Sequence, residues 1–264
     1  MPPNTRLPTF ARVMLYCQFL GSNVVLFEPA PFDILFIATL LVFVSGGYLC
    51  FHRGIKLIIV LLSVFMLLSL LSLTAVTDAP RGVEYLSITF YLILLCVFIT
   101  SVRLEFMEET LHIIFSACAV SAVLFTAVSL LDFYGVMPVP DAASLVTLDY
   151  TRLKGFFKDP NVFGPTISFS LLYLFHLLNQ RGNAPWRSLW SLAGVIILTA
   201  GVFLSYSRGA WVGLVLALGV YCLLMFVHRG FRLTLGQVTW QGFLLASLII
   251  GFGVVLQNPV RAKT

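Results

Sequence analysis

Residues 55–77 read IKLIIVLLSVFMLLSLLSLTAVT, an almost unbroken apolar run with a single lysine near its start. A run of about 20 such residues crosses the hydrocarbon core of a bilayer as one helix. Of the 264 residues in the chain, 59% are hydrophobic and only 10% are charged. A soluble domain of this length has too little interior to bury so much apolar surface. The sequence therefore predicts an all-α, polytopic integral membrane protein.

About nine apolar runs of comparable length are predicted to be transmembrane helices. Their approximate bounds are 10–27, 32–50, 55–77, 83–102, 110–131, 161–178, 188–205, 208–228 and 240–257. The connections between them are short except for 132–160, which is long, polar and contains proline. Because no internal repeat or low-complexity tract divides the chain, we expect residues 1–264 to form a single transmembrane domain.

The loop cations predict the orientation, because cytoplasmic loops carry an excess of Lys and Arg. A cytoplasmic N-terminus puts nine of the 16 lysines and arginines on the inner side. These nine are Arg6, Arg12, Arg53, Lys56, Arg103, Arg181, Arg187, Arg229 and Arg232. The prediction is thus a cytoplasmic N-terminus, a C-terminus outside, and an outer loop at 132–160.

Three cations gather on the predicted outer side in residues 151–165, TRLKGFFKDPNVFGP. Arg152, Lys154 and Lys158 lie within seven consecutive positions, and Gly155 between them allows a tight turn or a close approach to a ligand. Cations on the translocated side oppose the insertion preference. Such a cluster indicates a functional reason, although snorkelling of Arg and Lys to the headgroups is the structural alternative.

The next three residues, Asp159, Pro160 and Asn161, predict the start of a helix. Asp is a favoured N-cap, and Pro is favoured at the first helical position. This pattern is explained by helix capping alone. A helix N-terminus also presents free N–H groups and the positive end of the helix dipole, which suits a phosphate group.

A second outer cluster is predicted at residues 205–211, SYSRGAW, between the spans 188–205 and 208–228. Ser207 is expected to cap the second of these helices, and Arg208 and Gly209 follow it. Two helix starts and four cations on one side predict an anion pocket, because the planar fork of arginine matches phosphate oxygens. A lipid-linked diphosphate sugar fits such a pocket, with its polyprenyl chain among the Phe-rich helices.

The stretch RLKGFFKDPNVFGP, followed about forty residues later by SYSRGAW, resembles the bacterial O-antigen ligase and O-antigen polymerase superfamily. Its members carry an Arg-x-x-Gly…Asp/His-Pro-Asn stretch at the outer start of a span and a Ser-Arg-Gly turn one hairpin later. The stretch EPAPFDILF at 28–36 also looks like the entrance to the family's second span. The order and spacing of these motifs carry the resemblance across the chain.

The resemblance implies a helical bundle of roughly a dozen spans in the bacterial inner membrane. It implies transfer of a glycan from undecaprenyl diphosphate to lipid A–core, a growing polymer or a protein hydroxyl, without metal or cofactor and without nucleic acid. Arg152 and Arg208 would contact the diphosphate, with Lys154 and Lys158 as supporting charges. The residues that would shape the site are Gly155, Asp159, Pro160, Asn161, Ser207 and Gly209.

The chain departs from the family pattern after the Ser-Arg-Gly hairpin, where a large periplasmic loop normally follows the next span. We expect the chain to correspond to the N-terminal portion of such an enzyme. The four histidines, His52, His112, His176 and His228, map to cytoplasmic ends of the predicted spans. No catalytic residue is therefore identified, although an outer carboxylate such as Asp149 or Asp159 could act as a general base.

Two other functions remain open from the sequence. Some members of the superfamily have been described as bicarbonate transporters, and outer cations would also gather a small anion. Ion pathways place ionisable groups within spans, whereas Asp33 and Glu84 lie near predicted outer ends, which favours the transferase over the transporter. The third reading is a non-catalytic membrane scaffold. The sequence does not distinguish ligase from polymerase, or identify the sugar and the acceptor.

Overall fold

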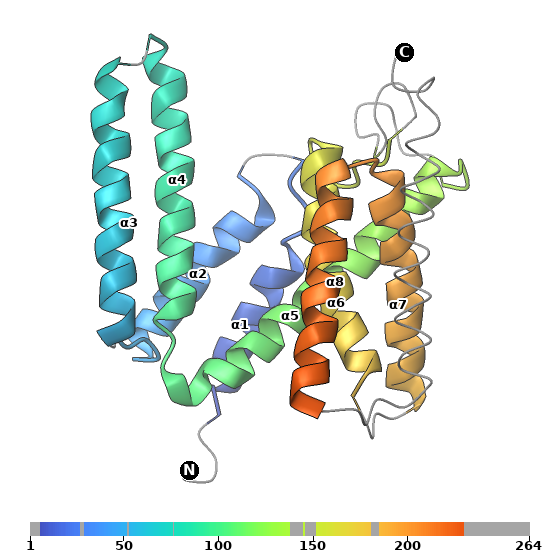
Figure 1. The fold of residues 1–264 in the computed structure, drawn as a ribbon. Helices are drawn as coiled ribbons and strands as arrows, with labels where there is room; N and C mark the ends of the chain where they lie inside the picture. Colours follow the sequence, from blue (N-terminus) through green and yellow to red (C-terminus); the bar gives the residue numbers. More distant parts are fainter. Residues whose placement is uncertain are drawn as a thin grey trace. The chain divides into compact units, whose positions relative to one another are not determined.

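The computed structural model describes residues 6–26, 29–51, 53–75, 77–137, 145, 152–180 and 185–229. These residues form helices and turns, and the described part of the chain contains no β-strand (Figure 1). The helices are α1 (Thr9–Leu20), α2 (Pro31–Ser45), α3 (Arg53–Ser72), the 3-10 helix η1 (Leu73–Ala75), α4 (Ala79–Thr100), α5 (Leu104–Phe133), α6 (Pro160–Leu178), α7 (Pro185–Leu204) and α8 (Arg208–Arg229). The predicted all-α class is confirmed for this part.

In the described part of the chain, six helical segments are long and apolar enough to span a membrane. They are Gly54–Ala75, Ala79–Thr100, Leu104–Phe133, Pro160–Leu178, Pro185–Leu204 and Arg208–Val227. The chain is thus a multi-pass membrane protein by the length and composition of its helices. Orientation and the full set of nine spans stay predictions, and the predicted span at 240–257 lies outside the described residues.

The first two predicted spans, 10–27 and 32–50, form helices shorter than a bilayer requires. At a rise of about 1.5 Å per residue, the 12 residues of α1 and the 15 of α2 extend less than the roughly 30 Å hydrocarbon core. The α2 helix ends in a Schellman turn, because Tyr48 N–H donates to the Phe43 carbonyl at 3.0 Å and Gly47 N–H to the Val44 carbonyl at 3.2 Å. The apolar run in the sequence continues past this turn, but the helix ends there. A prediction from hydropathy alone therefore overestimates the length of the helix.

The packing divides the chain into two compact units. The expectation that residues 1–264 form a single transmembrane domain stays a prediction. The first unit comprises residues 1–18 and 32–114. Aromatic rings in edge-on contact join α2 to α4, with Phe36 centred 5.6 Å and Phe43 centred 5.1 Å from Phe98. Such edge-to-face pairs add specific geometry to apolar packing.

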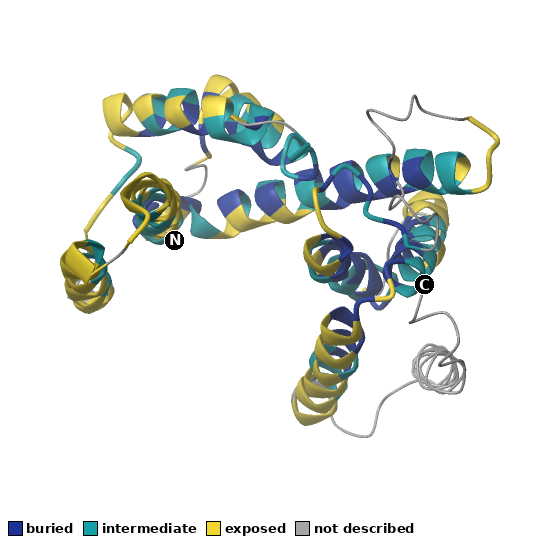
Figure 2. Cartoon of the chain, turned by 90° about the horizontal axis from the view of Figure 1, so that it is seen from above, coloured by how far each residue is buried: buried dark blue, intermediate teal, exposed yellow. Residues whose placement is uncertain are grey.

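The α3 and α4 helices of this unit have little of their surface covered (Figure 2). No residue in the most apolar 18-residue stretch of α3 is buried, and 6% of the corresponding stretch of α4 is. Leu67, Leu71 and Leu92, for example, are each more than half exposed. Because both helices are apolar except near their N-terminal ends, this surface is suited to lipid.

The second unit comprises residues 19–31 and 115–264. In its described part, α6 packs against both α7 and α8 around a core that includes Phe163, Ile167, Leu198, Val202 and Trp211. The two cation-bearing motifs of the sequence, 151–165 and 205–211, both fall in this unit. Most of the predicted outer loop, 138–144 and 146–151, lies outside the described residues.

Candidate functional site

The α6 helix starts where the sequence predicts. Asp159 is its N-cap, with an extended backbone (φ −137°, ψ 132°), and its Oδ1 accepts a hydrogen bond of 2.7 Å from the N–H of Asn161. Pro160 is the first helical residue, where its missing N–H costs no helical hydrogen bond. The predicted capping by Asp159 is confirmed.

The α8 helix starts at the second motif, as expected. Ser207 precedes its first residue, Arg208, and the Ser207 Oγ accepts a hydrogen bond of 3.3 Å from the N–H of Ala210. Trp211 on the first turn of α8 donates its indole N–H to the Val202 carbonyl of α7 at 2.9 Å. This buried bond fixes the start of α8 against the last turn of α7.

Arg152 joins these two helix starts. Its Nε donates to the Ser205 carbonyl at 3.0 Å, and its Nη2 donates to the Asn161 Oδ1 at 2.8 Å. The N–H of Leu153 adds a backbone bond of 2.8 Å to the Leu204 carbonyl. The N-termini of α6 and α8 lie at the same end of the second unit (Figure 1). The Arg152 guanidinium is bonded to both motifs there, to Asn161 and to the Ser205 carbonyl.

The segment that follows Arg152 is held as a compact turn. Lys154 and Gly155 both donate their N–H groups to the Leu145 carbonyl at 3.0 Å, and the Phe156 carbonyl accepts from Val25 N–H at 2.8 Å. Gly155 has a φ of +59°, and a Cβ there would lie 2.7 Å from the Phe163 ring. The prediction that Gly155 allows a tight turn is confirmed, and a side chain at this position would be destabilising both through its positive φ and through its contact with the Phe163 ring.

Apolar side chains of the same segment anchor it in the core. Leu153 and Phe157 are buried, whereas Arg152 and Lys154 are partly exposed and Lys158 is exposed. Alternation of buried apolar and accessible basic residues keeps the cations at the surface of the unit. The segment therefore has a fixed backbone that carries three cationic side chains at the surface of the second unit.

Arg208 and Gly209 occupy the first turn of α8, and both are exposed. No carboxylate in the described part of the chain is within ion-pair distance of Arg208 or Lys154. A Cβ on Gly209 would meet no atom within 4 Å. Within the described ranges, Arg208 therefore has no ion-pair partner, and it lies at the start of α8 beside helix N–H groups, which suits an anion.

The sequence reasoning missed two residues that shape this end of the unit. Ser205 supplies the carbonyl that Arg152 binds, and Gly164 lets α6 approach the α7–α8 turn. A Cβ on Gly164 would lie 2.7 Å from the Ser205 Oγ and 2.9 Å from the Ala210 Cβ. Gly164 lies three residues after Asn161, within the motif 151–165. A glycine near the start of a helix was the sequence feature that could have indicated this close approach.

The predicted site residues fall into two groups. Arg152, Asn161 and Asp159 are joined by hydrogen bonds, and Arg152 is also bonded to Ser205. Gly155, Pro160, Ser207, Arg208, Gly209, Lys154 and Lys158 lie in the same two motifs, in the segment before α6 and at the starts of α6 and α8. In the described ranges, no three His, Cys, Asp or Glu side chains are grouped so that they could hold a metal ion.

Comparison with protein-family models, with curated proteins and with solved structures found no match to this chain. The resemblance to the O-antigen ligase and polymerase superfamily therefore rests on the motifs at 152–165 and 205–211, and it stays a prediction.

Proposed function

We propose that this protein binds the diphosphate of a lipid-linked glycan where α6 and α8 begin, and that it transfers the glycan to an acceptor hydroxyl. The donor would be an undecaprenyl diphosphate-linked oligo- or polysaccharide in the bacterial inner membrane, and the acceptor a glycan or lipid A–core. The single observation that supports this proposal is the double hydrogen bond of Arg152 to Ser205 and Asn161, which joins the two motifs.

The chemistry of the site favours an anion with several oxygens. Arg152 is held by its bonds to the Ser205 carbonyl and the Asn161 Oδ1, so its positive charge lies where α6 and α8 begin. Arg208 adds a second guanidinium, and the capped starts of α6 and α8 add N–H groups and dipole ends. A diphosphate has enough oxygens to use several such donors at once.

In the proposed reaction, the bond between the anomeric carbon of the sugar and the diphosphate oxygen breaks, and a bond from that carbon to the acceptor oxygen forms. The acceptor hydroxyl gives up its proton to a base, and the diphosphate leaves with the electron pair. Cations at the leaving group stabilise the negative charge that develops on it. We assign no base among the described residues.

Arg208 provides the most direct test, because it is exposed and has no described bond that supports the fold. Arg208→Lys keeps the charge but loses the planar fork, so binding of undecaprenyl diphosphate to the purified full chain should weaken by roughly tenfold. Arg187→Lys is a matched control, because Arg187 is an exposed arginine at the opposite end of α7, over the Trp186 ring. Equal affinities of wild type, Arg208→Lys and Arg187→Lys would refute the proposed site.

A further inference from the structure

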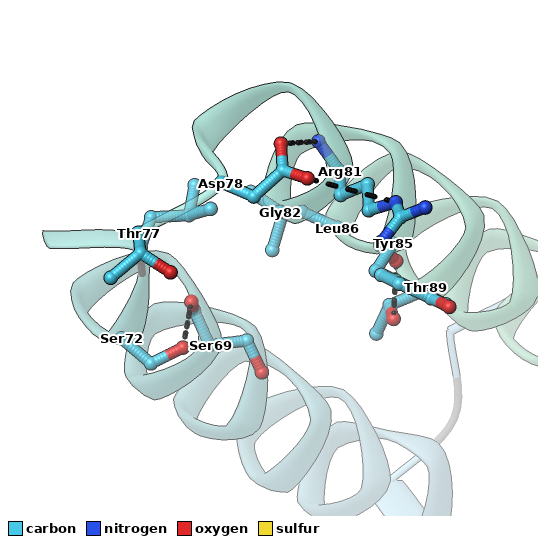
Figure 3. A pocket seen from close by; sticks show the side chains of 10 residues that line it. Ser69, Ser72, Thr77, Asp78, Arg81, Gly82, Tyr85, Leu86 and Thr89 are labelled. Atoms are coloured by element: carbon cyan, nitrogen blue, oxygen red, sulfur yellow. Dashed lines mark hydrogen bonds and ion pairs between the residues drawn. The ribbon is translucent and has the colours of Figure 1, made fainter. Parts of the chain in front are cut away.

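A cavity of about 430 Å³ lies between the C-terminal end of α3 and the N-terminal half of α4, in the first unit (Figure 3). Its lining runs from Ser69 on α3 through Asp78 to Thr89 on α4. The volume falls in the range of about 300–1,000 Å³ that is typical of small-molecule sites. This cavity has no part in the proposed transfer reaction.

The two charged residues among its described lining have opposite signs and form a pair. Asp78 caps α4 by accepting from the N–H of Arg81 at 3.3 Å, and its Oδ2 lies 3.6 Å from the Arg81 Nε (Figure 3). Both side chains are more than half exposed, and such exposed pairs contribute little to stability. Acid and base are thus available to a ligand, and the lining carries no net charge.

Hydroxyl groups supply further acceptors to the cavity. The Oγ of Ser69 donates to the Phe65 carbonyl at 2.9 Å, the Oγ of Ser72 to the Ser69 carbonyl at 2.7 Å, and the Oγ1 of Thr89 to the Tyr85 carbonyl at 2.8 Å. Each hydroxyl hydrogen is therefore used by its own helix, while the oxygen lone pairs stay free to accept. Together with Asp78 they suit a ligand group with several N–H donors.

The surface around the cavity is suited to lipid. It opens at one end of two apolar helices that have almost no buried surface, and Tyr85 on its wall is 70% exposed. Tyrosine is enriched at the level of the headgroups, where its ring is apolar and its hydroxyl is hydrated. At a rise of about 1.5 Å per residue, the stretch from Arg81 to Thr89 reaches some 12 Å along α4, enough for a headgroup and its glycerol.

We propose that this cavity binds the headgroup of a zwitterionic, amine-bearing glycerophospholipid, with the phosphate on Arg81 and the ammonium on Asp78 and the serine hydroxyls of α3. The acyl chains would lie along the exposed faces of α3 and α4. A trimethylammonium group has no N–H to donate to these acceptors, and an anionic headgroup would leave Asp78 facing negative charge. Phosphatidylethanolamine is therefore favoured over phosphatidylcholine and phosphatidylglycerol.

Native mass spectrometry of the full chain, equilibrated with equal amounts of these three lipids, tests the proposal. The wild type should retain phosphatidylethanolamine in preference to the others, and Asp78→Asn should reduce that preference by about threefold to tenfold. Asparagine is also a good N-cap, so this variant keeps the start of α4. Arg81→Gln should reduce retention of all three lipids, because all three carry a phosphate.

Glu105→Gln is the matched control, because Glu105 forms an ion pair of 2.9 Å with Arg103 elsewhere in the same unit. It should leave the lipid preference unchanged. Equal retention of the three lipids by the wild type, or an unchanged preference in Asp78→Asn, overturns the proposal. A phosphatidylethanolamine with a photoreactive headgroup adds a test without substitution: cross-links on wild type must map to residues 69–89, and cross-links confined to other residues overturn it as well.

Discussion

Arg152 and Asn161 are joined by a hydrogen bond of 2.8 Å from Nη2 to Oδ1, which ties the basic segment to the first turn of α6. The same guanidinium holds the Ser205 carbonyl. Arg152 is therefore a positioning residue as well as a candidate ligand of the diphosphate, and these two roles can be separated by substitution.

The substitution Asn161→Asp should separate the positioning role of Arg152 from its role as a ligand of the diphosphate. The carboxylate keeps an acceptor for Arg152, so the thermal stability of the purified protein should be preserved. The added negative charge at the anion site should lower affinity for undecaprenyl diphosphate by about tenfold. Asn161→Ala loses the acceptor instead, and the melting temperature should fall by the equivalent of about 1 kcal/mol. If Asn161→Asp binds the diphosphate as tightly as wild type does, this end of the unit is not the anion site.

Arg152→Lys should affect both stability and binding. A lysine ammonium on a flexible stem does not reproduce two hydrogen bonds in fixed directions, so the segment 152–159 should lose its attachment to α6 and to the α7–α8 turn. Limited proteolysis should then cut this segment faster than in wild type, and diphosphate affinity should fall. Arg208→Lys should lower affinity without faster cutting. Identical cutting of wild type and Arg152→Lys would contradict the positioning role.

Two glycines in the same unit give opposite expectations for alanine. Gly155→Ala places a Cβ at positive φ and against the Phe163 ring, so the free energy of unfolding should fall by about 2 kcal/mol or more. Gly209→Ala places a Cβ on the first turn of α8 in open space, and stability should be unchanged or rise by up to about 1 kcal/mol. Thermal unfolding in one detergent compares them, and equal losses would contradict the geometry of the turn.

The predicted orientation can be tested at two described positions. In a cysteine-free background, Lys158→Cys should react with a membrane-impermeant maleimide in intact cells, because it lies at the predicted outer end of α6. Arg187→Cys, at the predicted inner end of α7, should react only after permeabilisation. The reverse pattern would place the cation clusters in the cytoplasm and rule out transfer at the outer face.

The helix starts at the site were predictable because capping is local. Asp159 and Ser207 act on N–H groups two or three residues away, so a short window of sequence contains the whole interaction. The same holds for Gly155, where a glycine among larger residues indicates a turn.

The tie from Arg152 to Ser205 was not predictable, because the acceptor is a backbone carbonyl 53 residues away. Every residue has such a carbonyl, so no residue type marks the partner. The lengths of α1 and α2 were missed for a related reason. Hydropathy sums side chains, whereas the end of α2 depends on backbone bonds such as that from Tyr48 to Phe43.

The distance along the chain between Arg152 and Ser205 also sets an order of assembly during synthesis. At about 5–20 residues per second, a ribosome needs roughly 3 to 10 s to extend the chain by the 53 residues that separate them. During that interval the basic segment has been synthesised but lacks its hydrogen bond to the Ser205 carbonyl. Insertion of the α7–α8 hairpin is thus the step that completes the attachment of Arg152, and a nascent chain arrested before Ser205 would carry the cations without their final support.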